Sequence, residues 1–495
     1  MELTALRLLL LPLLLAAPLA AAETVLGAYI FHRHGDRTTK SYKPVSLTAL
    51  GAEQVFASGT YYRNRYVASD AQTRIQGIAP DVAVLSQLSV TSPVDDVLQH
   101  SAQVFLQGLY PPAGAASVQT LANGSRTEPP LGGYVYVPVN AVSTAASSGG
   151  SENSEWLQGG SGCANAVVSS NNYFASREYL DTLASTKDFY HGLLPVVNST
   201  FSDSQATFKN AYTIFDYVHV STIHNQTIPA ADLLTNETLH QLQTRADQHE
   251  WGLAYNSSEP VRAIAGAVLA GQILQALNDT LRAPVASATA QRLTIQFGAY
   301  AAFMSFFGLA NATAASPDFY GIVDYASNFV LELVTNATTP SSGALDPADA
   351  SVRFLFVNGT VGDNNPPRVY PLFGRSDALI PWSDFAAEMG RFAIADTASW
   401  CRACGNSTGV CATALGNDGG DSGNSSAAGT SSTSHKGSGG MSRAVAGVVG
   451  AMVTLAVVLG LEALVLAVGG LRLVKKGNVA GKQASSPVGP SVTQA

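Results

Sequence analysis

An apolar run near the N-terminus, followed at once by a cluster of charged residues, constrains the fold most. Thr24 to Phe31 (TVLGAYIF) is almost continuously apolar, which is typical of a β-strand buried on both faces. The sequence Arg33-His34-Gly35-Asp36-Arg37 comes directly after it. In open α/β sheets, ligands bind beyond the carboxyl ends of the strands. The arrangement therefore predicts an α/β sheet with a binding site at the end of its first strand.

The chain up to residue 411 continues with alternating helical and strand patterns. Helical patterns cover 47–66, 94–109, most of 170–282 and 300–309, and strand patterns cover 293–298 and 369–373. Strands that alternate with helices and are interrupted by a helical block are typical of an α/β core with an insertion. We therefore expect an open-sheet core in residues 23–411 with an α-helical insertion at about 170–282.

The charged cluster has the chemistry of a phosphoryl site. Arg33 and Arg37 flank His34, and guanidinium groups make forked, charge-assisted hydrogen bonds to phosphate oxygens. A neutral imidazole nitrogen is a competent nucleophile toward phosphorus, and Gly35 allows the backbone to approach a ligand closely. The alternative is a surface turn that happens to hold these residues. His32, at the end of the strand, is interpreted as structural.

These motifs and several later ones resemble the histidine acid phosphatases, the phytase-like branch of the histidine phosphatase superfamily. The family pattern R-H-G-x-R-x-P is matched at 33–39, with Thr39 in place of the proline. LTALGAEQ at 47–54, HSAQVFLQGLYPP at 100–112 and VRAIAGAVLA at 261–270 are similar to family segments, and YPLFGRSDALIPWSDF at 370–385 and the cysteines after Trp400 match fungal members. The resemblance covers residues 24 to about 411.

The resemblance implies a mechanism in which His34 attacks phosphorus and forms a phosphohistidine that water hydrolyses, while Arg33 and Arg37 hold the phosphoryl oxygens. It also exposes three gaps. The third arginine of the family pattern falls on Val97, and the family's His-Asp pair falls on Ala299 and Tyr300. General acid catalysis typically contributes about 10²–10⁴-fold, so a severe loss on alkyl phosphates is expected.

Several side chains are candidates to replace the missing groups. Asp36 and Asp377 are possible substitute acids, and Arg375 is a possible substitute cation. Each is more simply a solvated or structural charge. Tyr300 is a weak acid, since its unperturbed pKa is about 10.

Three functional hypotheses remain open: an acid phosphatase with an altered acid, a pseudo-phosphatase that binds phosphate or a phosphorylated ligand without turnover, and a surface protein that uses the fold as a scaffold. The sequence holds no nucleotide-binding loop, EF-hand or H-E-x-x-H pattern, so we expect no cofactor or metal. The net charge is −8, which excludes the basic character of a nucleic-acid binder.

Both ends of the chain have targeting patterns. Residues 1–22 have the charged start, apolar centre and small-residue end of a signal peptide. Residues 444–471 are long and apolar enough to cross a bilayer, with Glu462 as the only charge. The basic tail at 472–495 predicts a type I orientation. Residues 412–440 are rich in Gly and Ser and are predicted to form a stalk.

The region between these ends has the signs of a secreted protein. It contains eleven N-x-S/T acceptors, at Asn123, Asn198, Asn225, Asn236, Asn256, Asn278, Asn311, Asn336, Asn358, Asn406 and Asn424. Its four cysteines, Cys163, Cys401, Cys404 and Cys411, suit two disulfides in an oxidising compartment. Three pairings are possible, and half of a zinc site at 401–404 is a less favoured alternative. We expect a glycosylated protein of the cell surface or of a secretory-pathway membrane.

Overall fold

β1 (Thr24–Arg33) is a central strand of an eight-stranded mixed sheet. The computed structural model describes residues 23–142, 162–339 and 343–416. The strand order is β10-β8-β7-β1-β6-β2-β5, and β9 pairs with β8 outside this path. The other strands are β2 (Leu88–Pro93), β5 (Asn140–Val142), β6 (Leu293–Gly298), β7 (Asn328–Thr335), β8 (Ala350–Val357), β9 (Arg368–Tyr370) and β10 (Leu379–Pro381).

The pairing of β1 brings the segment after β1 close to the segment after β6. β6 is parallel to β1, and Arg33 lies opposite Gly298 in the ladder. β7 is antiparallel to β1 on the other side. The carboxyl end of β1 therefore lies beside the start of the helix that follows β6, as expected for the two matching family segments.

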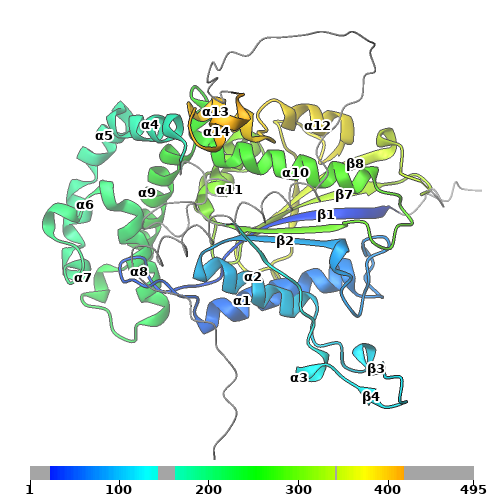
Figure 1. The fold of residues 1–495 in the computed structure, drawn as a ribbon. Coiled ribbons are helices and arrows are strands. Elements are labelled where there is room, and N and C mark those ends of the chain that lie inside the picture. Colours follow the sequence, from blue (N-terminus) through cyan, green and yellow to red (C-terminus); the bar gives the residue numbers. More distant parts are fainter. Residues whose placement is uncertain (1–22, 143–161, 340–342, 417–495) are drawn as a thin grey trace, which may run out of the picture. The chain divides into compact units, whose positions relative to one another are not determined.

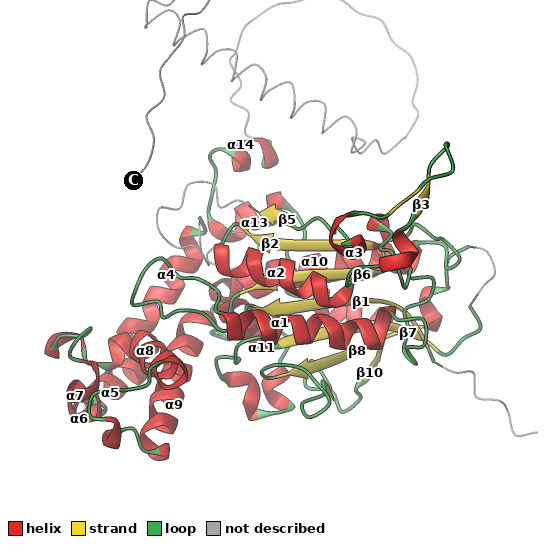
Figure 2. Cartoon of the chain, turned by 90° about the horizontal axis from the view of Figure 1, so that it is seen from below, coloured by secondary structure: helices red, strands yellow, loops and turns green. Residues whose placement is uncertain are grey.

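Helices cover both faces of the sheet (Figures 1 and 2). α1 (Ala49–Tyr62) and α2 (Asp96–Leu109) lie on one face, and α10 (Ile264–Arg282), α11 (Tyr300–Leu309) and α12 (Trp382–Gly390) lie on the other. Side chains of β1 alternate between the two cores: Ile30 joins the α1–α2 core and Phe31 the α10–α12 core. This alternation explains why β1 is apolar along its whole length.

A separate helical lobe stands at one end of the sheet (Figure 1). It comprises α4 (Ala164–Asn172), α5 (Arg177–Ser185), α6 (Lys187–Gly192), α7 (Leu194–Val197), α8 (Ala211–His224) and α9 (Asn236–Ala254). Buried residues such as Phe208 and Leu242 give it a core of its own. The predicted insertion began at about residue 170 and included α10. α10 instead packs on the sheet, because its residues from Ile264 to Gly271 are buried on all sides.

α10 is also relevant to the membrane prediction. Among the described residues, Pro260–Arg282 is the one helix long and apolar enough to cross a bilayer, and it is 67% buried inside the protein. Burial of this kind is typical of a core helix. The predicted signal peptide at 1–22 and the predicted span at 444–471 lie outside the described residues.

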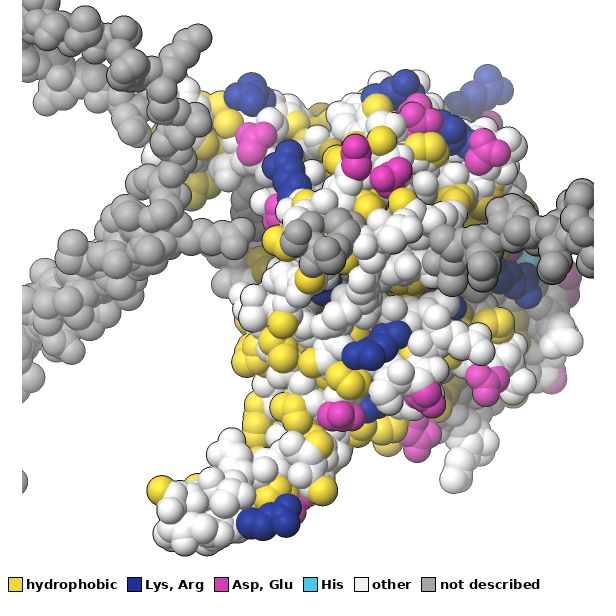
Figure 3. All heavy atoms as spheres, turned by 90° about the vertical axis from the view of Figure 1, so that its right-hand side faces the viewer, with side chains coloured by type: hydrophobic (Ala, Val, Ile, Leu, Met, Phe, Trp, Pro, Cys, Tyr) yellow, Lys and Arg dark blue, Asp and Glu magenta, His cyan; other side chains and the backbone are white. Residues whose placement is uncertain are grey.

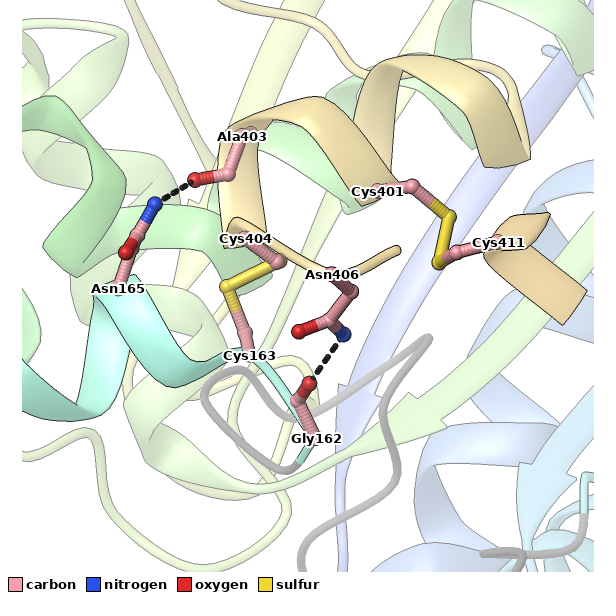
Figure 4. Close-up of a disulfide and its surroundings, with 8 residues drawn as sticks. All are labelled: Gly162, Cys163, Asn165, Cys401, Ala403, Cys404, Asn406 and Cys411. Atoms are coloured by element: carbon pink, nitrogen blue, oxygen red, sulfur yellow. Dashed lines mark hydrogen bonds between the residues drawn. A yellow bond between two sulfur atoms is a disulfide. The ribbon is translucent and has the colours of Figure 1, made fainter. Parts of the chain in front are cut away.

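Two disulfides join the C-terminal helices α13 (Thr397–Cys404) and α14 (Val410–Ala414) to the fold (Figure 4). Cys163 pairs with Cys404, and Cys401 pairs with Cys411. This settles the pairing that the sequence left open and leaves no thiolate of the C-x-x-C for a metal. α14 extends to Ala414 and the description to residue 416, so the folded part passes the predicted stalk boundary at 412 by a few residues.

The remaining described elements are peripheral. β3 (Gln119–Thr120) and β4 (Arg126–Thr127) form a small hairpin, and α3 (Pro130–Gly133) follows it, all projecting from the body (Figure 1). On the face turned away from the helical lobe, basic and acidic side chains are interspersed (Figure 3).

Candidate functional site

Arg33 is the last residue of β1 and is buried in a cage of aromatic rings. Its guanidinium carbon lies 4.7 Å from the ring centre of Tyr325 and 5.5 Å from that of Tyr300. Its Nη1 donates to the carbonyl of Val323, while its Nε has no hydrogen-bond partner among the described residues. Cation–π contacts stabilise a desolvated guanidinium without neutralising it. The two rings therefore stabilise a guanidinium that is largely removed from solvent.

His34 follows Arg33 and is completely buried. Its Nδ1 donates to the carbonyl of Gly35 across 2.8 Å, which fixes the tautomer with the proton on Nδ1. The free lone pair is then on Nε2, so Nε2 is the ring nitrogen that is able to act as a nucleophile. The ring lies 5.6 Å from that of Tyr325, so His34, Arg33 and Tyr325 share one site.

Arg37 lies in the same site but is paired with a carboxylate. Its Nη2 is 2.8 Å from Oδ1 of Asp216 and 3.0 Å from the hydroxyl of Tyr212, both on α8. Oδ2 of Asp216 accepts from the Thr39 hydroxyl and the Lys40 amide. Asp216 thus anchors the helical lobe to the segment after β1. It also occupies donors that a phosphoryl group would use.

Gly35 is required by packing of the backbone on α1. A Cβ at Gly35 would lie 2.2 Å from the carbonyl oxygen of Gly51, and a Cβ at Gly51 would lie 2.0 Å from that of Asp36. The packing of α1 therefore gives a structural reason for glycine at position 35, and the expected close approach of a ligand to this backbone stays a prediction. The Gly35 amide donates to the Ser101 hydroxyl of α2, which places the HSAQ segment beneath the motif.

Asp36, one of the two candidate acids, is buried and turned toward α1 and α8. Its Oδ1 accepts from the hydroxyl of Thr48, the N-cap residue of α1, and from Nε2 of His224 across 2.7 Å. Its Oδ2 has no hydrogen-bond partner among the described residues. Its described contacts therefore join the segment after β1 to the start of α1 and the end of α8.

The other proposed replacements lie elsewhere. Asp377 is exposed on the loop before β10, and Arg375 pairs with Asp384 of α12 across 3.2 Å. Neither lines the cavity beside Arg33. The structure therefore gathers the two arginines and His34 but does not bring Asp377 or Arg375 to that cavity.

The segments with the missing family residues do meet at the site. Tyr300 begins α11, packs 4.9 Å from the Tyr212 ring, and donates its hydroxyl to Glu250 of α9 across 2.7 Å. Val97 is buried one turn before Ser101 on α2. The Tyr300 hydroxyl proton is thus donated to Glu250 of the helical lobe.

His32 is structural, as expected. It is completely buried between the rings of Phe105 and Phe297, and its Nδ1 contacts the Arg33 carbonyl. Burial lowers its pKa from 6.5 to about 4, because the charged form is poorly solvated there. A histidine held neutral in an apolar environment is suited to packing.

The cavity beside Arg33 is small. Its volume is about 20 Å³, which suffices for about one water molecule. The lining residues are Arg33, Tyr212, Phe215, Asp216, His219, Ile322, Val323, Asp324 and Tyr325. Burial lowers the pKa of His219 and raises that of Tyr325. This cavity by itself is too small for a phosphomonoester, so a larger ligand could enter it only if Asp216 or the 322–325 segment moved.

Sequence reasoning missed the contribution of α8. Tyr212, Asp216 and His219 follow at spacings of four and three residues and therefore share one helix face. That face lines the cavity together with Tyr325. The spacing was visible in the sequence, but nothing local indicated that its partner was Arg37, which lies 179 residues before Asp216.

Comparison with known proteins identifies the family. The model of the histidine phosphatase superfamily, branch 2, matches residues 41–357. The match covers more than half of the chain, and the chain belongs to this superfamily. The match begins after the Arg33–Arg37 motif, so that motif stands on its own geometry. No curated protein sequence matches the chain.

Solved structures support the same fold. The chain is similar to the phytase of Hafnia alvei in complex with tartrate, with 14% identity, a TM-score of 0.51 and coverage of 78% of this chain and 99% of that one. The phytase of Citrobacter braakii has 12% identity and a TM-score of 0.52, and the match covers 77% of this chain and 99% of that one. The chain is also similar to the Hafnia alvei phytase in complex with myo-inositol hexakis sulphate. That match has 15% identity and a TM-score of 0.50, and it covers 78% of this chain and 99% of that one. At these identities the likeness concerns the fold.

Proposed function

We propose that the protein is a phosphomonoesterase that acts through a phosphohistidine at His34, with an activity reduced by the absence of the usual proton donor. The observation that carries the proposal is the placement of His34. Its Nδ1 is fixed by the Gly35 carbonyl, and it stands between Arg33 and Arg37 at the end of β1. Nε2 attacks phosphorus, the leaving oxygen departs, and water then cleaves the N–P bond.

The geometry favours substrates with good leaving groups. The departing oxygen gains negative charge, and an acid is needed most when that oxygen is strongly basic. Tyr300 stands where the family places its acid, and its hydroxyl is engaged with Glu250. A phenolate leaves with a pKa of about 10, whereas an alkoxide is more basic. Aryl phosphates should therefore react slowly, and alkyl phosphates, including inositol phosphates, should be nearly inert.

A second candidate function is supported by the Arg37–Asp216 ion pair. A carboxylate 2.8 Å from the guanidinium competes with phosphate, and the adjoining cavity is too small for an ester in this conformation. Such a site suits a pseudo-phosphatase that binds phosphate or a phosphorylated ligand, with opening of the lobe, and does not turn it over. The phosphorylated ligand is the expected partner in both proposals.

We place the protein on the cell surface or in a secretory-pathway membrane as a type I glycoprotein. The support comes from the sequence patterns at 1–22 and 444–471 and from the acceptor asparagines. Of the acceptors that the structure describes, seven are exposed: Asn123, Asn198, Asn225, Asn236, Asn311, Asn336 and Asn358. Two disulfides agree with an oxidising compartment. Protease added to intact cells should remove the folded part and spare the tail; a protected folded part contradicts this topology.

The catalytic proposal is tested on the purified full-length protein. It is incubated with an aryl phosphate and with an alkyl phosphate at acidic pH, and the phosphoenzyme is trapped by a rapid alkaline quench. We expect aryl turnover and a trapped phosphohistidine, both lost in His34→Ala. Phosphate binding without any phosphohistidine would establish the second candidate instead. Absence of both binding and turnover would contradict both.

A further inference from the structure

A second cavity lies outside the Arg33–His34–Arg37 site. It has a volume of about 620 Å³, within the range of small-molecule sites. It is formed by α5 and α9 of the helical lobe, the 3₁₀-helix η10 (Pro317–Tyr320), the following Gly321 and Ile322, and Asn358 after β8. No step of the proposed phosphatase reaction uses it.

The lining of this cavity is acidic. Each of three elements contributes one carboxylate: Glu178 from α5, Asp247 from α9 and Asp318 from η10. Among the described residues that line the cavity, none is Lys or Arg. Arg245, on α9, donates to Gln248 across 3.1 Å. The charge of the cavity therefore calls for a cationic occupant.

Two aromatic side chains add a second preference for cations. Trp251 of α9 and Tyr320 of η10 line the cavity, with ring centres 4.7 Å apart and planes tilted by 59°. Tyr320 is 48% exposed, although large aromatic side chains usually bury more of their surface. Ring faces attract ammonium groups and pack against the methylene carbons between them.

The carboxylates do not converge on a single point. In the part of the chain that the structure describes, no group of three or more His, Cys, Asp or Glu side chains is placed to hold a metal ion. One divalent ion would therefore leave most of the acidic lining unpaired. A linear molecule with several ammonium groups separated by methylenes fits both the dispersed carboxylates and the rings.

We propose that this cavity binds a linear polyamine. Asp247 is the central contact in this proposal: it lines the cavity, and its Oδ1 accepts from the Ile322 amide across 2.8 Å. The Ile322 side also leads to Val323, whose carbonyl accepts from Arg33. The proposed polyamine site does not use the residues of the phosphatase reaction. The two cavities are neighbours, since Ile322 lines both of them.

Protonation of Asp247 should make polyamine binding depend on pH. Burial raises its pKa from 3.8 to about 6, helped by Asp324 and opposed by the Ile322 amide and His240. Glu178 and Asp318 are the other charged groups that line the same cavity. A cation binds the ionised form, so affinity should fall as the pH is lowered through about 6.

The test is calorimetric titration of the purified full-length protein with spermidine, with tryptophan fluorescence as a second signal. We expect saturable binding that Asp247→Asn weakens at least about tenfold, equivalent to about 1.4 kcal/mol. Asn keeps the acceptor for Ile322. Glu178→Gln and Asp318→Asn, both at exposed positions, should each weaken binding and guard against a folding defect in the first variant.

Matched controls separate the proposal from its competitors. Asp181→Asn removes an exposed carboxylate of α5 that does not line the cavity and should leave spermidine binding unchanged. Equal losses in Asp181→Asn and Asp247→Asn would overturn the proposal in favour of diffuse attraction. Binding of N-acetylglucosamine or Ca²⁺ in place of spermidine, or spermidine binding that does not change below about pH 6, would also overturn it.

Discussion

At the residue scale, Asp216 is the carboxylate that pairs with Arg37 in the proposed phosphate site. It is 3% exposed and pairs with Arg37, which is completely buried. Burial of an ion pair costs desolvation of both groups, and this cost is offset only when their remaining hydrogen bonds are made. Asp216 meets that condition through Thr39 and Lys40. The same pairing must be exchanged when a phosphoryl group binds Arg37.

The first prediction follows from this competition. Asp216→Asn keeps the shape and removes the negative charge beside the anion site. We expect vanadate to bind about tenfold more tightly, a gain of about 1.4 kcal/mol, measured by titration and by the rise in thermal midpoint. Arg37→Ala should lose most of the vanadate effect, and Asp181→Asn should resemble the wild type. Weaker vanadate binding in Asp216→Asn would mean that Asp216 holds Arg37 in its binding position.

The second prediction concerns the missing acid. Ala299→His together with Tyr300→Asp restores the family pattern beside Arg33. The new carboxyl would lie near Glu250, the present partner of Tyr300, and a neighbouring carboxylate raises the pKa of an acid. We expect alkyl phosphate hydrolysis to rise much more than aryl hydrolysis, by at least about 10²-fold. Comparable gains on both substrates would show that the acid was not the missing group.

Loss of the Tyr300 ring will also cost stability, because it packs against Tyr212 and Arg33. Large-to-small changes of buried aromatic residues typically cost about 3–5 kcal/mol. Tyr300→Phe is the matched control: it keeps the ring, loses the hydrogen bond to Glu250 and should not gain alkyl activity.

At the element scale, the predictability of the fold depended on how local each signal was. The segments 47–66, 94–109 and 300–309 were predicted as helices and 293–298 as a strand, and the structure has α1, α2, α11 and β6 there. α1 stops at Tyr62 and a π-helical turn follows. The strand at 369–373 is shorter than predicted, since β9 covers only Arg368–Tyr370.

Two long strands of the antiparallel half of the sheet, β7 and β8, were not predicted. β7 reads NFVLELVT and is buried at every position, and β8 reads ASVRFLFV. Short apolar runs of this kind do not show whether they are strands or buried helical turns. These segments are strands because of their tertiary pairing, since β7 lies between β1 and β8 in the sheet. The Arg37–Asp216 contact was missed for a similar reason, because only the tertiary fold brings α8 to the end of β1.

The third prediction belongs to the C-terminal helices. The Cys163–Cys404 bridge closes 241 residues, and the Cys401–Cys411 bridge closes 10. In the loop-entropy account, the longer loop gives roughly 3 kcal/mol more stabilisation. Replacing Cys163 and Cys404 by serine should therefore lower the free energy of unfolding more than replacing Cys401 and Cys411. Each double variant buries two hydroxyls, so the two are matched. Equal losses in denaturant titrations would contradict the entropic account.

At the scale of the whole molecule, one buried carboxylate ties distant parts of the core together. Glu332 of β7 is completely buried. It accepts from Arg65 across 2.7 Å, from Tyr66 across 2.5 Å and from Arg353 of β8 across 2.6 Å. Arg353 also pairs with Glu23 at the start of β1. The network joins the π-helical turn after α1, two strands and the first described residue.

The last prediction is the pH dependence that this network creates. Burial alone would raise the pKa of Glu332, but Arg65, the Tyr66 hydroxyl and Arg353 hold it below 4.5. A carboxylate whose folded pKa is depressed stabilises the protein above its unfolded pKa, about 4.3, and loses that contribution as the pH falls through the folded value. Glu332→Gln should therefore cost about 3 kcal/mol at neutral pH, and the difference from wild type should shrink below about pH 4. Glu388→Gln, which removes the partner of the largely exposed Arg391, should show almost no loss. A Glu332→Gln penalty that stays constant across the acid range in denaturant titrations would mean that shape, not charge, is what the network supplies.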